Sequence, residues 1–213
     1  MSSVDTTVII CCAGMGTRLG IGTTKALLHI DGKQLIIHQL EALKDYTDIR
    51  VVVGYQADRV IDVVNSYRKD IMFVFNNEYK ETGAAASLCK ALVKTRKFIL
   101  TIDGDILIKP SDFKRILDEK GEFLAVSKKN SCEPVLVNVK NEQAIHFDNE
   151  GNYEWPGVAK IESSMITKGS GFTYEIIEKL LPIRSVVVDS RDIDTPEDYE
   201  NASDWASKGY SYR

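Results

Sequence analysis

The sequence VIICC at residues 8–12 is followed without a break by AGMGTRLG at residues 13–20. A run of small and β-branched apolar residues that ends at a glycine is typical of a buried strand. Glycines directly after a strand allow a sharp turn, and they let backbone N–H groups approach an anion such as phosphate. The loop is not GxGxxG, because Leu19 replaces the last glycine, and it is not a P-loop, because no Gly-Lys-Ser/Thr follows. The stretch predicts an α/β protein with a phosphate-binding loop, and a plain tight turn is the alternative.

The segments that follow alternate between short β-rich runs and amphipathic helices. We predict strands at residues 50–53, 71–75 and 98–103, and helices at residues 34–43, 57–67, 84–94 and 111–117, the last with Ser111 as its N-cap. Beyond residue 122 the pattern changes to short strands at 123–127, 135–139 and 185–189, a helix at 173–181 and a last helix that starts at Thr195-Pro196. This order predicts one domain over residues 1–213, with a Rossmann-like three-layer α/β fold and a mostly parallel sheet that carries a small mixed β extension.

Composition excludes several classes of protein. The 27 Lys+Arg residues and 31 Asp+Glu residues give a net charge of −4, so no basic surface indicates nucleic-acid binding. No apolar run approaches the length of a membrane span, and Asp5 with no basic segment argues against a secretion signal. The four cysteines form no CxxC pair, which favours a reducing, cytoplasmic location. The oligomeric state stays open, and a homo-oligomer is compatible with the sequence.

Two cations accompany the glycine-rich loop. Arg18 lies inside it, and Lys25 follows seven residues later. Glycine amides, an arginine fork and a lysine point charge together form a set that can bind a triphosphate.

Acidic residues follow at the end of a predicted strand. Asp103 and Asp105 belong to IDGD at residues 102–105, and ligands of an open parallel sheet bind at the carboxyl ends of its strands. Carboxylates in that place can hold Mg²⁺, and a turn with solvated acids is the alternative. A second acidic cluster comes before the last helix, where Asp198 suits the helix N-terminus and Asp194 is the better metal ligand.

The loop together with TKALLHIDGKQLI at residues 24–36 resembles the signature of the nucleotidyltransferase superfamily, which includes sugar-phosphate pyrophosphorylases and phosphocholine cytidylyltransferases. The family pattern is approximately AAGxGxRL followed by PKALLxxxGKPLI. Cys12 and Thr24 depart from it, but neither change removes a donor or a charge. Residues 76–79 (NNEY), 82–88 (TGAAASL) and 192–199 (DIDTPEDY) resemble later family segments, so the resemblance covers nearly the whole chain.

The resemblance implies roles for individual residues. Arg18 and Lys25 are the expected catalytic residues, and Asp105 and Asp194 are the expected ligands of Mg²⁺. The expected nucleotide-binding residues are Ala13, Gly14, Met15, Gly16, Thr17, Gly83, Ala84, Ser87 and Asp103. The expected acceptor-binding residues are Glu133, Glu154 and Trp155, for which solvated charges and a core aromatic residue are the alternatives.

The implied activity is nucleotidyl transfer from an NTP, with CTP preferred, to a small phosphorylated or phosphonylated alcohol or amino-alcohol, with release of pyrophosphate. Residues 1–120 would form the nucleotide-binding half and residues 121–213 the acceptor-binding half. The alternatives are a sugar-1-phosphate nucleotidyltransferase that uses UTP, dTTP or GTP, and a non-catalytic nucleotide sensor on the same fold.

Overall fold

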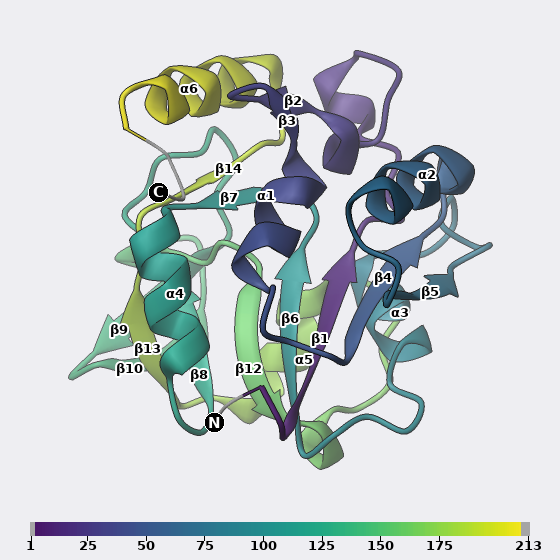
Figure 1. Cartoon of the computed structure of the whole chain (residues 1–213). Helices are drawn as coiled ribbons and strands as arrows, with labels where there is room; N and C mark the ends of the chain where they lie inside the picture. The colour runs from purple at the N-terminus through teal and green to yellow at the C-terminus, as the bar shows by residue number, and fades with distance from the viewer. Residues whose placement is uncertain (1–2, 210–213) are drawn as a thin grey trace.

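The computed structural model describes residues 3–209, and a ten-stranded sheet runs through the middle of this part of the chain (Figure 1). The strand order is β11-β9-β10-β13-β8-β12-β6-β1-β4-β5. At its centre, β1 (Thr6–Cys11) pairs in parallel with β4 (Ile49–Val53) and with β6 (Phe98–Asp103), and β5 (Met72–Phe75) pairs in parallel with β4. The apolar run of β1 is buried on both faces, as a strand in the middle of a covered parallel sheet requires.

The second half of the chain extends the same sheet. β12 (Val158–Glu162) runs antiparallel to β6 and to β8 (Phe123–Val126), and β13 (Ile183–Val187) is parallel to β8. From β13 to β5, six strands therefore run in one direction, and β12 between β8 and β6 runs in the opposite direction. The strands β9 (Leu136–Lys140), β10 (Gln143–Phe147) and β11 (Tyr153–Glu154) form an antiparallel ribbon at the edge. The predicted mostly parallel sheet with a small mixed extension is confirmed.

Helices cover both faces of the sheet, which gives three layers (Figure 1). Buried residues of α1 (Leu35–Ala42), α2 (Ala57–Tyr67) and α4 (Pro110–Asp118) belong to one apolar core. Buried residues of α3 (Ala84–Lys90) and α5 (Thr173–Ile177) belong to a second core on the opposite face. Among the helices of residues 3–209, none combines the length and apolarity needed to cross a bilayer.

A third, smaller core lies beneath α6 (Pro196–Ser207) at the upper end of Figure 1. It includes Ile30 of β2 (His29–Ile30), which pairs antiparallel with β3 (Lys33–Gln34). Next to it, β14 (Ser190–Asp192) pairs antiparallel with β7 (Ile106–Ile108), so that Asp192 lies opposite Ile106. This pairing brings the segment before α6 to the turn that follows β6.

Several predicted boundaries differ from the structure. Ser111 is not the N-cap of α4, because Pro110 takes the first helical position and Lys109 precedes it. The helix predicted over 84–94 ends at Lys90, and the one predicted over 173–181 changes after Ile177 to a 3₁₀ turn, Glu178–Leu180. Further 3₁₀ turns cover Thr17–Leu19, Lys25–Leu27 and Ser163–Met165.

Candidate active site

A cleft opens at the carboxyl ends of β1 and β6. Its lining includes part of the glycine-rich loop, both predicted cations and the turn after β6: Cys11, Cys12, Gly14, Gly16, Thr17, Arg18, Thr24, Lys25, Ala26, Gly104 and Asp105. Ala13 and Met15, also expected to bind nucleotide, are not part of this lining, and Ala13 is buried in the core. The cleft therefore brings the first and fourth predicted strands together, at the edge of the sheet where ligands of open α/β proteins bind.

The glycine-rich loop is fixed by its backbone. Gly16 has φ +61°, in the left-handed region, and a Cβ there would lie 3.1 Å from Cγ of Lys25 and 3.3 Å from the carbonyl oxygen of Thr23. A Cβ on Gly14 would have no heavy atom within 4 Å, because this residue faces open space in the cleft. Leu19, 2% exposed, anchors the far end of the loop in the core. Gly16 is thus required by the fold, whereas Gly14 keeps the cleft clear.

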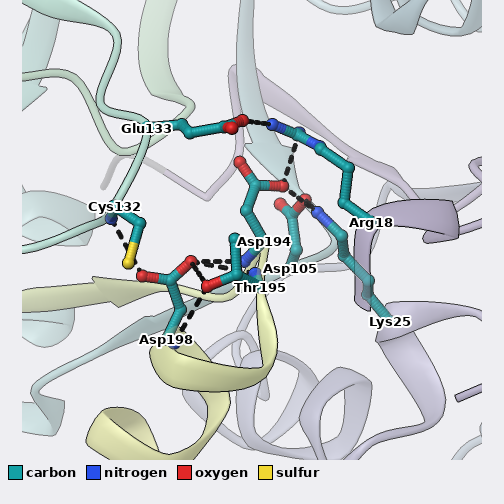
Figure 2. Close-up of polar contacts among 8 residues, drawn as sticks. All are labelled: Arg18, Lys25, Asp105, Cys132, Glu133, Asp194, Thr195 and Asp198. Atoms are coloured by element: carbon teal, nitrogen blue, oxygen red, sulfur yellow. Dashed lines mark hydrogen bonds and ion pairs between the residues drawn. The ribbon is translucent and has the colours of Figure 1, made fainter. Parts of the chain in front are cut away.

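Both predicted cations contact the predicted metal ligands (Figure 2). Nζ of Lys25 lies 2.8 Å from Oδ2 of Asp105 and also pairs with Oδ1 of Asp194. Nη2 of Arg18 lies 2.7 Å from the same oxygen of Asp194, and Nη1 of Arg18 pairs with the carboxylate of Glu133. Residues 18, 25, 105, 133 and 194 therefore form one charged cluster, which includes both cations, both metal ligands and one acceptor residue expected from the sequence.

The cluster changes the pKa values of its members. Burial alone would lower the pKa of Lys25, but the charges of Asp105 and Asp194 outweigh it and raise that pKa. Burial raises the pKa of Asp192 and of Asp103 well above the usual range, and the charge of Asp105 adds to both shifts. Lys25 is therefore a permanent cation, and burial together with the neighbouring carboxylates opposes the ionisation of Asp103 and Asp192.

Asp105, Asp192 and Asp194 each offer an oxygen, and these oxygens lie within 4.8 Å of one another. Carboxylate oxygens are the donors that Mg²⁺ prefers, so the residues present fit a divalent cation. Asp192 was not predicted as a ligand from the sequence. The spacing of Asp192 and Asp194 held the signal, since residues two apart on an extended strand point to the same side.

Asp103 points to a different neighbour. Its carboxylate contacts Gly157 so closely that a Cβ on that glycine would overlap it. Oδ1 of Asp103 is buried and has no hydrogen-bond partner within the described part of the chain. The charges of Asp105, Lys25 and Asp194 act on Asp103, so it lies beside the acidic cluster and keeps an unused hydrogen-bonding atom there.

Gln39 bonds to the backbone of the turn that contains Asp103 and Asp105. This residue of α1 is 2% exposed, and its Nε2 donates to the carbonyl oxygens of Asp103 at 2.9 Å and Ile106 at 3.0 Å. The sequence showed Gln39 only as a position on the inner face of a helix. A polar side chain at a position expected to be buried was the signal that it would form hydrogen bonds to the backbone.

Gly83, Ala84 and Ser87, which were expected to bind nucleotide, lie outside the lining of the cleft. Gly83 donates its N–H to Ser170, and a Cβ on Gly83 would overlap the carbonyl oxygen of Gly171, so this glycine fits against the 170–171 loop. Ser87 is buried, and its hydroxyl accepts a hydrogen bond from Asn76 at 3.0 Å. The structure does not bring Ser87 to the glycine-rich loop. Ala84 is the first residue of α3 and also lies outside the cleft lining.

Two expected acceptor residues lie inside the protein. Glu154 is 1% exposed, and its carboxylate accepts the N–H groups of Asn130 and Ser131 at 2.9 and 3.2 Å. Trp155 is 4% exposed, and its indole N–H donates to Val158. Both side chains bond to backbone groups inside the protein, and the Glu154 carboxylate holds residues 130 and 131, shortly before Glu133. Acceptor contact by Glu154 and Trp155 stays a prediction.

Comparison with known proteins gives relatives by sequence. The bifunctional protein GlmU of Sulfurimonas denitrificans is 23% identical over 190 residues, which are 86% of this chain and 42% of the relative. GlmU of Aliarcobacter butzleri is 32% identical over 110 residues, 51% of this chain and 25% of the relative. The chain thus spans less than half the length of these curated relatives.

Solved structures share the fold. The inositol-1-phosphate CTP transferase from T. maritima superposes with a TM-score of 0.73 at 22% identity, covering 97% of this chain and 98% of that one. The CTP:phosphocholine cytidylyltransferase LicC from Streptococcus pneumoniae gives 0.75 at 21% identity, covering 94% and 99%. HddC from Yersinia pseudotuberculosis gives 0.73 at 20% identity, covering 93% and 98%.

A family model for the MobA-like NTP transferase domain matches residues 8–151, which is more than half of the chain. This range starts at β1 and includes the glycine-rich loop, Lys25 and the turn of Asp103 and Asp105. The chain therefore belongs to the family of MobA-like NTP transferase domains.

Proposed function

We propose that this protein transfers a nucleotidyl group from an NTP to a small phosphorylated or phosphonylated acceptor. An oxygen of the acceptor phosphate attacks the α-phosphorus, a new P–O–P bond forms, and the bond to the β-phosphate oxygen breaks to release pyrophosphate. No general base is needed, because the attacking phosphate is already an anion at neutral pH. The observation that supports this reaction most strongly is the convergence of Arg18, Lys25, Asp105 and Asp194 on the cleft of the glycine-rich loop.

The protein groups would act mainly by positioning and by charge. Loop amides beside Gly14 would contact phosphate oxygens from one side of the cleft. Arg18 and Lys25, which now pair with carboxylates, would stabilise the negative charge that grows on the α-phosphate and on the departing pyrophosphate. Asp103, with an unused buried oxygen, would accept a hydrogen bond from a hydroxyl of the nucleotide.

Asp105, Asp192 and Asp194 would hold Mg²⁺. The bound ion would supply electrostatic stabilisation of phosphate charge. These carboxylates would also keep Arg18 and Lys25 directed into the cleft, because each cation contacts at least one of them.

We assign the nucleotide to residues 1–120 and the acceptor to residues 121–213. CTP is the preferred nucleotide, which is supported by the resemblance to cytidylyltransferases and by the shared fold with two CTP-using enzymes. Glu133 would contact the acceptor, since its exposed carboxylate pairs with Arg18, which lines the cleft. An acceptor with an ammonium or hydroxyl groups suits that carboxylate. Four free thiols are typical of a reducing compartment, so we expect the protein in the cytoplasm.

The second candidate is a sugar-1-phosphate nucleotidyltransferase that uses UTP, dTTP or GTP. It is favoured by the shared fold with a putative glucose-1-phosphate thymidylyltransferase from Bacillus anthracis, which gives a TM-score of 0.72 and covers 98% of each chain at 17% identity. A non-catalytic nucleotide sensor is the third candidate, but a sensor has no need of three converging carboxylates.

The test is a pyrophosphate-release screen. Each NTP is combined with phosphocholine, 2-aminoethylphosphonate, glycerol phosphate, inositol phosphate and hexose 1-phosphates, with Mg²⁺ and with EDTA. We expect release with CTP and one alcohol or amino-alcohol phosphate, and loss of release in EDTA. Thermal shifts with each NTP supply a second readout, because the bound nucleotide stabilises only the native state. A clear preference for UTP, dTTP or GTP with a hexose 1-phosphate would replace our proposal by the second candidate.

A further inference from the structure

Asp198, in the first turn of α6, is an acidic residue with more partners than a helix cap needs. Its side chain is buried, with 2% of the residue exposed. In a capping box, the third residue of a helix bonds back to the N-cap residue. Asp198 does so, since Oδ2 accepts the backbone N–H of Thr195 at 2.9 Å and its hydroxyl at 2.8 Å.

The same carboxylate reaches two further backbone groups (Figure 2). Oδ2 of Asp198 accepts the N–H of Asp194 at 3.3 Å, and Oδ1 accepts the N–H of Cys132 at 3.0 Å. Cys132 belongs to the segment between β8 and β9, residues 127–135, which we name the acceptor loop. One buried side chain thus joins the segment before α6 to a loop 66 residues away in sequence.

Each of these bonds leads to a residue of the proposed active site. Asp194 contacts Arg18 and Lys25 through its own carboxylate. Cys132 is followed directly by Glu133, whose carboxylate contacts Arg18. The two sides of the charged cluster are therefore held at a common point by Asp198.

All the groups around the Asp198 carboxylate are donors, so only an ionised carboxylate satisfies them. Burial would raise the pKa of Asp198, but the hydrogen bonds from Thr195 and Cys132 outweigh it and lower that pKa. An amide in this place has one acceptor oxygen. Three donors converge on Oδ2, and the N–H of Cys132 donates to Oδ1. The single oxygen of an asparagine would therefore occupy the position of Oδ2, and its NH₂ group would face the N–H of Cys132.

We propose that Asp198 is a positioning residue that fixes the metal-binding Asp194 and the acceptor loop relative to each other. The inference rests on the proposed nucleotidyl transfer for its functional part. Its structural part, the tie between Asp198 and Cys132, does not depend on any activity.

The variant Asp198→Asn breaks the tie to Cys132 with little change in shape. Thr195→Val is the matched control, because it removes both bonds of the Thr195 hydroxyl, the one donated to the Asp198 carboxylate and the one accepted from the Asp198 N–H, and keeps the bonds from the N–H groups of Thr195 and Cys132 to Asp198. Both variants lower the melting temperature. Kinetics are therefore compared at a temperature well below both midpoints.

The first measurement is hydrogen exchange of the Cys132 amide. Loss of an acceptor should speed its exchange about tenfold or more in Asp198→Asn, and Thr195→Val should leave it near the wild-type rate. Unchanged exchange in Asp198→Asn overturns the inference, whether or not the protein turns over any substrate.

The second measurement separates KM from kcat in a double-mutant cycle. Asp198→Asn should raise the acceptor KM about tenfold, and this effect should nearly vanish in a Glu133→Gln background, because both residues act through the acceptor loop. Thr195→Val should leave the acceptor KM nearly unchanged in either background. An equal KM increase in both backgrounds, or an equal increase in Thr195→Val, overturns the inference. If wild-type protein releases no pyrophosphate with any pair, the proposed function fails, and hydrogen exchange still decides the tie to Cys132.

Discussion

Replacing Lys25 by methionine should separate its effect on the stability of the protein from its proposed effect on catalysis. In the structure its ammonium lies among carboxylates: 2.8 Å from Asp105 and in contact with Asp194. The side chain of Lys25 is 14% exposed, and those of its partners are 27% and 11% exposed. Methionine keeps an unbranched side chain of nearly the same length and removes the charge, so the two aspartates lose their shared cation.

The magnitude follows from the spacing of the carboxylates. Oxygens of Asp105, Asp192 and Asp194 lie within 4.8 Å of one another. At an effective dielectric constant of ~20, two unit charges at that separation repel by roughly 3.5 kcal/mol. Partial protonation of the aspartates and the surrounding solvent reduce this repulsion. We therefore expect the free energy of unfolding of Lys25→Met in EDTA to be about 2–3 kcal/mol below that of wild type. For a chain of this length that is a fall of roughly 5–10 °C in melting temperature.

Mg²⁺ should reverse much of this loss. A divalent cation held by the same carboxylates replaces the missing positive charge, and no ammonium competes with it. We therefore expect Lys25→Met to bind Mg²⁺ about tenfold more tightly than wild type without nucleotide, because a neighbouring cation no longer repels the ion. Its kcat/KM should still fall about 100-fold, because the charge on the phosphates is no longer stabilised.

The assay is thermal unfolding in EDTA and over a Mg²⁺ titration. The matched control is Lys33→Met, which breaks the surface pair with Glu41 at 2.7 Å and should cost less than about 1 kcal/mol. The gap between Lys25→Met and wild type should shrink by at least half in excess Mg²⁺, and the gap for Lys33→Met should not change. A Lys25→Met variant as stable as wild type in EDTA, or one whose gap ignores Mg²⁺, would refute the reasoning.

The remaining predictions concern the metal ligands, the loop and a buried histidine. Asp105→Asn and Asp194→Asn should each lower pyrophosphate release steeply, with partial recovery in Mn²⁺, and the double variant should lose much less than the product of the two; losses that multiply would mean separate roles. Gly14→Ala should keep the melting temperature and weaken NTP binding about tenfold, whereas Gly16→Ala should also lose about 1 kcal/mol of stability because its φ is positive. Burial lowers the pKa of His38, so the unfolded chain binds its proton more readily, and stability should fall as pH drops from about 6.5 through the lower folded pKa. Urea midpoints of His38→Gln should depend less on pH in that window, and equal slopes would contradict this account.

Local sequence determined the elements and the chemistry of their ends. The apolar run before AGMGTRLG predicted a buried strand, and the structure has β1 at Thr6–Cys11 in the centre of the sheet. The Thr195-Pro196 start of the last helix was also predicted, because an N-cap hydroxyl and a proline at the first helical position act within one turn. Ser111 was assigned wrongly because Pro110 outcompeted it over the same short range.

Tertiary structure decided which of these residues meet. Asp105 and the segment of Asp192 and Asp194 are brought together by the pairing of β7 with β14, and no local pattern reports that register. The sequence therefore indicated Asp194 as a candidate ligand through its resemblance to the family, whereas the position of Asp192 beside it and Asp105 became evident only in the fold.

In the second half of the chain, local sequence predicts even less of which residues meet. Glu154 and Trp155 lie in a polar, aromatic stretch that suits an acceptor pocket, yet strand pairing and packing bury both and satisfy them with backbone. Asp198 looked like an ordinary helix cap, and only the approach of residues 127–135 gives it a bond to Cys132. The sequence by itself determined which candidate groups for phosphate and metal this chain carries, because turns, caps and charges act over a few residues. Their distances, burial and partners were decided by the fold, because contacts between distant segments depend on how the whole sheet is assembled.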